Sequence, residues 1–194
     1  MEVAGDTDGN YIIRSMSVFR KGLSPHQTAL AMIGAKAGSQ VLVLGADDPA
    51  LAGEVALVTG LNGRTLVVDP DVAAEKRIET AAGQAGALIE FTRAPRTMLP
   101  LDSDTFDVVV LPGLAALSPE ERVMTVGEGL RVARPGGRVV IVAREKRPGV
   151  FGVLAPKVPL IGAATATELL SSAGARAVRR LAVQEGTAYY EGRK

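Results

Sequence analysis

The sequence predicts an α/β fold: a seven-stranded sheet of five parallel strands and a C-terminal antiparallel hairpin, with helices on both faces. Apolar runs without a polar side, such as Val41 to Leu44 and Leu66 to Val68, are typical of parallel strands covered on both faces. Helical segments separate these runs, which implies right-handed crossovers within one sheet. The last two strand-like runs are joined by Glu185-Gly186 alone, and so short a turn allows only an antiparallel hairpin.

The 194 residues have the composition of one globular domain, 47% hydrophobic and 22% charged. A net charge of +1 without a basic run favours no nucleic-acid partner. The absence of cysteine excludes disulfides, a thiol nucleophile and a thiolate metal site. The polar start MEVAGDTDGN is unlike a signal peptide, and no apolar run reaches the roughly 20 residues that span a bilayer. We expect a cytoplasmic protein with an N-terminal extension over 1–23 and a domain over 24–194.

The elements follow from local signals taken in order. Ser24-Pro25 opens a helix that continues to about Lys36 and that Gly38 ends. Ser118-Pro119 opens another, with two glutamates in its first turn. Thr165 and Glu168 have capping-box spacing at the start of a short helix. Further helices are expected over 50–59, 71–85 and 119–132, an irregular stretch over 93–105, and strands at 41–44, 66–68, 87–92, 106–111, 138–143, 175–184 and 187–190.

Three motifs in this order resemble the class I S-adenosylmethionine-dependent methyltransferases, especially the quinone and small-molecule methyltransferases. LRVARPGGRVVIV (130–142) is similar to the family's helix, Pro-Gly-Gly turn and fifth strand. MLPLDSDTFDVVVLPGLAAL (98–117) is similar to its entry into the fourth strand, and VLVLG followed by VVDPD is the third match. The resemblance covers nearly the whole chain after Ser24 and implies a Rossmann-like sheet.

The resemblance also implies S-adenosylmethionine as cofactor and a place for it. Gly45 and Ala46 would line its methionine end, in the turn after the first strand. Asp69 stands where the family's acid accepts hydrogen bonds from the ribose hydroxyls, next to Pro70. A helix N-cap before Pro70 is the structural alternative for Asp69, and the two roles are compatible.

Two of the family's cofactor signatures are altered. In the glycine-rich first turn, Asp47 and Pro49 replace the second and third glycines, and Asp47 brings a negative charge towards the expected cofactor carboxylate. Asp48 capping a helix that Pro49 begins explains this turn structurally. The acid that usually binds the adenine amino group falls on Pro95. Arg96 could stack on adenine, but we favour a solvated loop arginine.

Candidate catalytic and substrate residues are few. His26, the only histidine, could deprotonate an acceptor, although a solvated histidine at a helix end is the favoured reading. One histidine and no cysteine leave no recognisable metal site. The apolar, Gly- and Pro-rich loop over 144–164 could shape an acceptor pocket, contact a second subunit in a homodimer or a membrane surface, or pack over the sheet edge. Possible substrate contacts are Tyr11, Tyr189, Tyr190, Phe151, Leu154 and Leu160.

These observations leave two main hypotheses. The first is methyl transfer from S-adenosylmethionine to a small, rather apolar acceptor, which needs positioning and exclusion of water more than a catalytic motif. The second is a non-catalytic relative that has lost cofactor binding, favoured by Asp47, Pro49 and Pro95. A nicotinamide-dependent oxidoreductase fails on the missing G-x-G-x-x-G.

Overall fold

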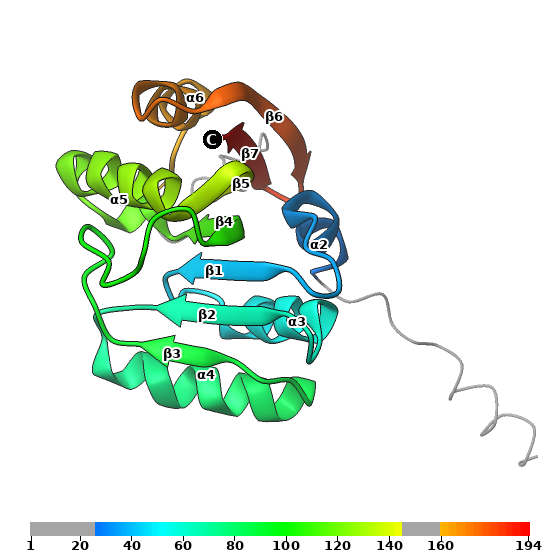
Figure 1. Ribbon diagram of the computed structural model, residues 1–194. Coiled ribbons are helices and arrows are strands. Elements are labelled where there is room, and N and C mark those ends of the chain that lie inside the picture. Colours follow the sequence, from blue (N-terminus) through cyan, green and yellow to red (C-terminus); the bar gives the residue numbers. More distant parts are fainter. Residues whose placement is uncertain (1–25, 145–159) are drawn as a thin grey trace, which may run out of the picture.

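A computed structural model, which describes residues 26–144 and 160–194, shows a seven-stranded sheet between two layers of helices (Figure 1). The predicted contacts Tyr11, Phe151 and Leu154, and the extension over 1–23, lie outside the described residues. The strands are β1 (Gln40–Leu44), β2 (Arg64–Val68), β3 (Glu90–Thr92), β4 (Phe106–Pro112), β5 (Ala133–Arg144), β6 (Arg176–Gln184) and β7 (Thr187–Arg193).

The strand order is β3-β2-β1-β4-β5-β7-β6. β1 to β5 pair in parallel, while β7 is antiparallel to both β5 and β6. This confirms the predicted fold, including the terminal hairpin. Because the order reverses between β1 and β4, a crevice is expected beyond the carboxyl ends of these two strands.

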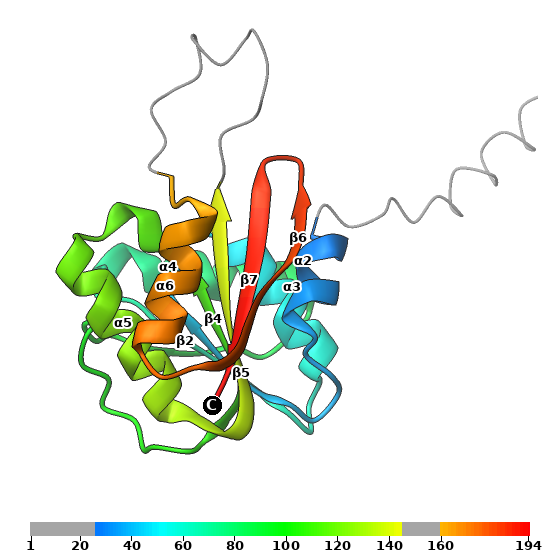
Figure 2. The same ribbon diagram turned by 90° about the horizontal axis from the view of Figure 1, so that it is seen from above.

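Helices cover both faces of the sheet, with α5 and α6 on one side and α2 and α3 on the other (Figure 2). Their bounds are α2 (Gln27–Ile33), α3 (Pro49–Thr59), α4 (Val72–Ala85), the short 3₁₀ helix η1 (Leu114–Ala116), α5 (Pro119–Val132) and α6 (Ala163–Ser172). Each face has its own apolar core, since alternate residues of β1 contribute to opposite sides. Among the helices that the structure describes, none has the length and hydrophobicity to cross a membrane.

Predicted start signals work at two helices. The Asp48 carboxylate accepts a hydrogen bond from the Leu51 N–H at the start of α3, with Pro49 at the first helical position. Ser118 opens α5 with a complete capping box.

The N-cap alternative for Asp69 is wrong. α4 begins at Val72, and the Asp71 carboxylate caps it through the Ala73 N–H.

Three boundaries differ from the prediction. α2 ends at Ile33, three residues before the end expected at about Lys36, because Gly34 adopts a left-handed conformation (φ 67°). The predicted capping box at Thr165 is wrong: α6 begins at Ala163 after Gly162, so Thr165 already lies inside the helix. β3 contains only Glu90–Thr92, half of the expected strand.

The Pro-Gly-Gly turn lies within β5 rather than before it. Pairing with β4 passes from Phe106–Ala133 to Val108–Arg138, so the extra residues form a bulge. Gly136 has φ 77° there, a conformation that glycine adopts without strain. The bulge lets the chain leave α5 and enter the central part of β5 at once.

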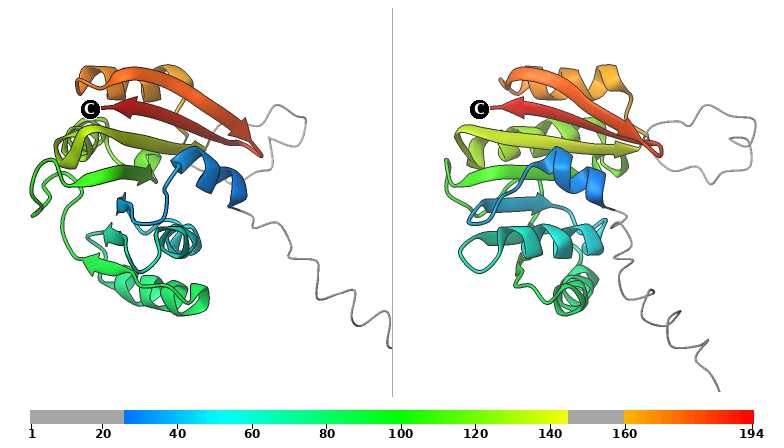
Figure 3. Two further views of the ribbon diagram at one scale, coloured as in Figure 1. Left: turned by 45° about the vertical axis from the view of Figure 1, so that its right-hand side comes forward. Right: turned by 90° about the vertical axis from the view of Figure 1, so that its right-hand side faces the viewer.

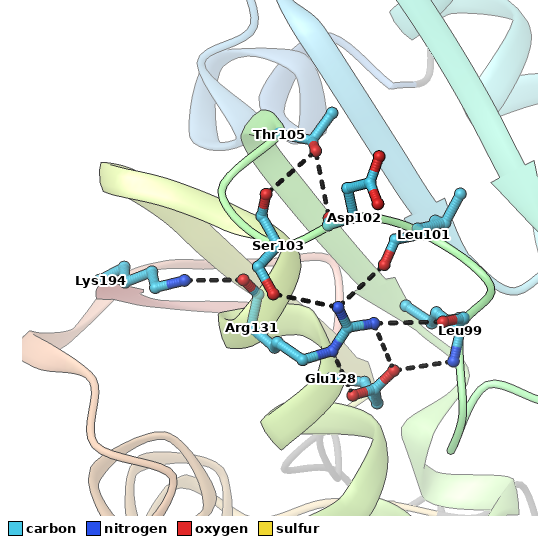
Figure 4. A network of polar contacts seen from close by, with 8 residues as sticks. All are labelled: Leu99, Leu101, Asp102, Ser103, Thr105, Glu128, Arg131 and Lys194. Carbon is cyan, nitrogen blue, oxygen red and sulfur yellow. Dashed lines mark hydrogen bonds and ion pairs between the residues drawn. The ribbon is translucent and has the colours of Figure 1, made fainter.

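An irregular connection over 93–105 replaces a crossover helix between β3 and β4, as predicted. The guanidinium of Arg131, near the end of α5, donates to the carbonyls of Leu99 and Leu101 and pairs with Glu128 (Figure 4). Glu128 also accepts from the Leu99 N–H, 2.7 Å away. The network fastens this connection to α5 and buries Leu99 in the core.

α2 lies against the sheet between α3 and the β6–β7 hairpin (Figure 3). Arg138 of β5 donates to the carbonyls of Met32 and Ile33 at the end of α2 and pairs with Glu191 of β7. Glu191, only 1% exposed, also pairs with Arg179 of β6. The start of α2 is thereby held near the carboxyl ends of β1 and β4.

Candidate functional site

A cavity of about 540 Å³ opens at the carboxyl ends of β1, β4 and β5, at the point where the strand order reverses. α2 and the start of β7 complete its wall. Most of its lining is apolar or small. The lining residues are His26, Ala29, Asp47, Asp48, Leu51, Pro112, Gly113, Ala115, Ala116, Val142, Ala143, Arg144, Thr187 and Tyr189.

His26 stands in the wall of this cavity, held by two carboxylates. Its Nδ1 lies 2.9 Å from Oε1 of Glu54 and its Nε2 lies 3.1 Å from Oδ2 of Asp48. Since carboxylates only accept hydrogen bonds, both ring nitrogens donate when the imidazole is charged. Burial lowers the pKa of His26, but the hydrogen bond to Glu54 and the charges of Asp48 and Glu54 outweigh it, so the pKa is raised. The surroundings favour an imidazolium over a proton acceptor.

Tyr189 of β7 brings a phenol to the same cavity. Burial, together with the charges of Asp48 and Glu185, raises the pKa of its hydroxyl. The group therefore stays protonated and can donate a hydrogen bond to a ligand. Its neighbour Tyr190 points to the other face and is fully buried in the core.

Asp69, at the end of β2, lies beside the turn that follows β1. Its Oδ2 accepts from the Ala46 N–H at 2.8 Å, and its Oδ1 accepts from the Asp71 N–H at 2.9 Å. Arg96 Nη2 lies 2.6 Å from the same Oδ2. Burial alone raises the pKa of Asp69, but these hydrogen bonds lower it more, so the carboxyl stays ionised. The residue is only 4% exposed.

Arg96 is buried between two acids, so the solvated loop arginine favoured from the sequence is wrong. Its side chain is 12% exposed and its Nη2 also lies 3.1 Å from Oδ2 of Asp47. The guanidinium therefore bridges the acids that follow β1 and β2. Its Nε is buried without a hydrogen-bond partner. Asp47, Arg96 and Asp69 are called the acid–arginine bridge below.

Gly45 shows what the bridge occupies. The residue has φ 125°, and a Cβ placed on it would lie 2.5 Å from Oδ2 of Asp47 and 2.7 Å from Cζ of Arg96. Side chains of the bridge thus fill the space that the missing Cβ leaves, while no backbone atom stands that close. Asp47 also covers Gly113 (φ 67°), where a Cβ would lie 2.2 Å from its Cγ.

The structure brings Gly45, Ala46 and Asp69 together at one edge of the sheet, and His26 lies across Asp48 from them. Pro70 is exposed, and its carbonyl accepts a hydrogen bond from Arg93. Leu160 is exposed and outside the cavity lining. In the ranges 26–144 and 160–194, no three metal-type ligands cluster. The pairing of Arg96 with Asp69 was not predicted, because a contact across 27 residues leaves no local signal.

Comparison with known proteins gives a match to one family model and a shared fold. Residues 50–141 match the family model described as a methyltransferase domain. No curated protein sequence matches the chain.

Solved structures share the fold at low sequence identity. An S-adenosylmethionine-dependent methyltransferase from Aquifex aeolicus is 18% identical, with 92% of this chain and 96% of that chain covered and a TM-score of 0.73. A protein described as a putative O-methyltransferase from Nostoc punctiforme is 15% identical, with 93% of this chain and 58% of that chain covered and a TM-score of 0.73. The [4+2]-cyclase SpnF is 16% identical, with 87% of this chain and 78% of that chain covered and a TM-score of 0.63.

Proposed function

Since residues 50–141 belong to the methyltransferase-domain family and the chain has the class I methyltransferase fold, we propose that it transfers a methyl group from S-adenosylmethionine to a small, rather apolar acceptor. Methyl transfer in general is what the family match supports. The acceptor class rests on the cavity, which is the observation that carries the proposal.

The cavity suits a small acceptor in place, size and lining. It lies where open α/β sheets bind their ligands, and about 540 Å³ is within the range of small-molecule sites. Apolar side chains such as Leu51 and Val142 supply about half of the surface, and polar groups, among them His26 and Asp48, supply the rest. Tyr189 can orient the acceptor by donating a hydrogen bond, and the apolar part of the wall would contact the carbon skeleton of the acceptor.

The backbone around Asp69 fits the cofactor, whereas the present side-chain arrangement does not. Gly45 and Ala46 would hold the methionine end and Asp69 the ribose, with Pro70 beside it. When bound, the cofactor supplies a methyl group on a positively charged sulfur. Before that, Arg96 must leave Asp69, because it occupies the acceptor that the ribose hydroxyls need.

The remaining assignments are proposals of the same kind. His26 would act on the acceptor from the α2 side, more by its charge than as a base, given the two carboxylates around it. The loop over 144–164, with Phe151, Leu154 and Leu160, would add to the acceptor pocket or contact a second copy. We further propose a cytoplasmic protein without a nucleic-acid partner.

A non-catalytic role is the second candidate, and the acid–arginine bridge specifically favours it. A bridge that never opens would exclude the ribose, and Asp47 would repel the cofactor carboxylate. The [4+2]-cyclase SpnF shares the fold, so the fold alone does not require methyl transfer.

Calorimetric titration with S-adenosylmethionine and S-adenosylhomocysteine distinguishes the two candidates. Methyl transfer predicts binding of both, and about 2.7 kcal/mol of added stability against unfolding at a ligand concentration one hundred times Kd. Absence of heat and of thermal stabilisation at millimolar ligand would favour the non-catalytic candidate. Acceptor screening with radiolabelled methyl donor follows a positive result.

A further inference from the structure

Arg96 is paired with Asp69, the acid at the end of β2. Its Nη2 lies 2.6 Å from Oδ2 of Asp69, the oxygen that also accepts from the Ala46 N–H. The other oxygen accepts from the Asp71 N–H. Every carboxylate oxygen of Asp69 is thus engaged within the protein, and a sugar diol can reach Oδ2 only in place of Arg96.

The obstruction is made of side chains and not of backbone. The three atoms nearest to a Cβ placed on Gly45, apart from those of its chain neighbours, belong to the side chains of Asp47 and Arg96. Arginine has a long, flexible side chain, so it can turn away without a change in the strands. Once the Asp47 side chain has turned away as well, the backbone cradle of Gly45 and Ala46 would be open next to the cavity.

The closed position of Arg96 is also incompletely satisfied. Its Nε is buried without a hydrogen-bond partner, although donors buried in this way are normally paired. An unpaired buried donor penalises the state that contains it. The bridge is therefore weaker than the two ion pairs with Asp47 and Asp69 suggest.

We propose that Arg96 is a gate residue, which occupies the ribose subsite at Asp69 in the free protein and must be displaced by a ribose-bearing ligand. The inference rests on the proposed function, because it concerns the same cofactor site. It explains why Asp69 and Gly45 are present at the expected places while Arg96 occupies the subsite beside them. If the gate is closed nine-tenths of the time, the apparent affinity for a ribose-bearing ligand falls about tenfold.

The test compares Arg96→Ala with the unchanged protein by calorimetric titration of adenosine, S-adenosylhomocysteine and methionine. Arg93→Ala is the matched control, since Arg93 belongs to the same connection but bonds the Pro70 carbonyl and not Asp69. We expect Arg96→Ala to bind adenosine and S-adenosylhomocysteine about tenfold more tightly, with methionine affinity and the control unchanged.

A second variant covers the case in which Arg96→Ala does not fold, because Asp69 would lose its buried partner. Asp47→Asn removes one carboxylate from the bridge and leaves Asp69 paired with Arg96. Since adenosine has no carboxylate for Asp47 to repel, tighter adenosine binding by Asp47→Asn reports loosening of Arg96.

The outcomes separate the gate from the function. If the unchanged protein binds S-adenosylhomocysteine and the folded variants bind adenosine no more tightly, the gate is overturned and the proposed function stands. If neither the unchanged protein nor any variant binds a ribose-bearing ligand, both are overturned.

Discussion

The Asp69 carboxylate accepts three internal hydrogen bonds, so its charge contributes to folding as well as to any ligand contact. We expect Asp69→Asn to lower the free energy of unfolding at pH 7 by about 1–3 kcal/mol, because an amide replaces an ionised acceptor. The pKa of Asp69 is lowered by folding, so this contribution is present above its unfolded value of about 3.9 and is lost as the pH falls through the folded value.

Urea unfolding of the two proteins between about pH 7 and pH 2 measures this difference, and the gap should narrow towards the acid end. Equal stability at pH 7 would mean that the three hydrogen bonds do not form in solution.

His26 gives the opposite pH dependence. Its pKa is raised by folding, so its contribution to stability is complete below the unfolded value of about 6.5 and is lost as the pH rises through the folded value. We expect the free energy of unfolding to decline with pH in that window more steeply than in His26→Gln. Urea unfolding at several pH values tests this, and parallel pH profiles would contradict the two carboxylate contacts.

Individual residues were predictable where their partners are close in sequence. Asp48 caps a helix that begins at the next residue, and the Ser118 capping box closes within three. Arg96 differs, because its partners Asp47 and Asp69 become neighbours only when three strand ends meet. Nothing in the residues around Arg96 distinguishes it from a solvated arginine.

At the scale of elements, the connection over 93–105 depends on Arg131 for its position. Arg131→Ala removes hydrogen bonds to two carbonyls and to Glu128, so we expect a loss of roughly 1–3 kcal/mol in the free energy of unfolding and faster hydrogen exchange at Leu99.

The matched control is Arg134→Ala, an exposed arginine paired with Asp107, whose loss should change stability by roughly 0.5 kcal/mol or less. Similar effects of the two substitutions would show that Arg131 is an ordinary surface residue.

Strand cores and helix existence followed from apolar runs and caps, whereas several element ends did not. α2 ends early because Gly34 takes the left-handed conformation and Arg138 binds the last carbonyls of the helix. Gly38 is an equally good helix-ending residue in the sequence. The contact of Arg138 in β5 with the last carbonyls of α2 therefore decides that the helix ends before Gly34. α6 begins at Ala163, and its N-cap Gly162 has no side chain that could accept a hydrogen bond. No sequence pattern indicates this start.

For the whole molecule, Glu191 joins the terminal hairpin to the parallel sheet. It is buried and pairs with Arg138 of β5 and Arg179 of β6. We expect Glu191→Gln to lower the free energy of unfolding by about 1–3 kcal/mol, because Arg138 and Arg179 lose a charged acceptor but keep contact with solvent. Thermal and urea unfolding measure this, with Glu90→Gln, which breaks an exposed pair with Arg64, as the milder control. Equal losses of unfolding free energy in Glu191→Gln and Glu90→Gln would contradict a stabilising role for the burial of Glu191.

The five parallel strands and the terminal antiparallel hairpin were predictable, since strands alternate with helices and a two-residue turn joins the last two strands. The same topology indicated the crevice and the place of Asp69. It could not indicate that a side chain from the β3–β4 connection fills this place, because that depends on the path of an irregular segment.

The most direct test is a crystal structure of the protein grown with saturating S-adenosylhomocysteine. The account predicts the ribose hydroxyls within hydrogen-bond distance of the Asp69 carboxylate, Arg96 turned away from it, and the sulfur facing the cavity lined by Tyr189. Arg96 still on Asp69, with no ligand at the end of β2, would contradict it.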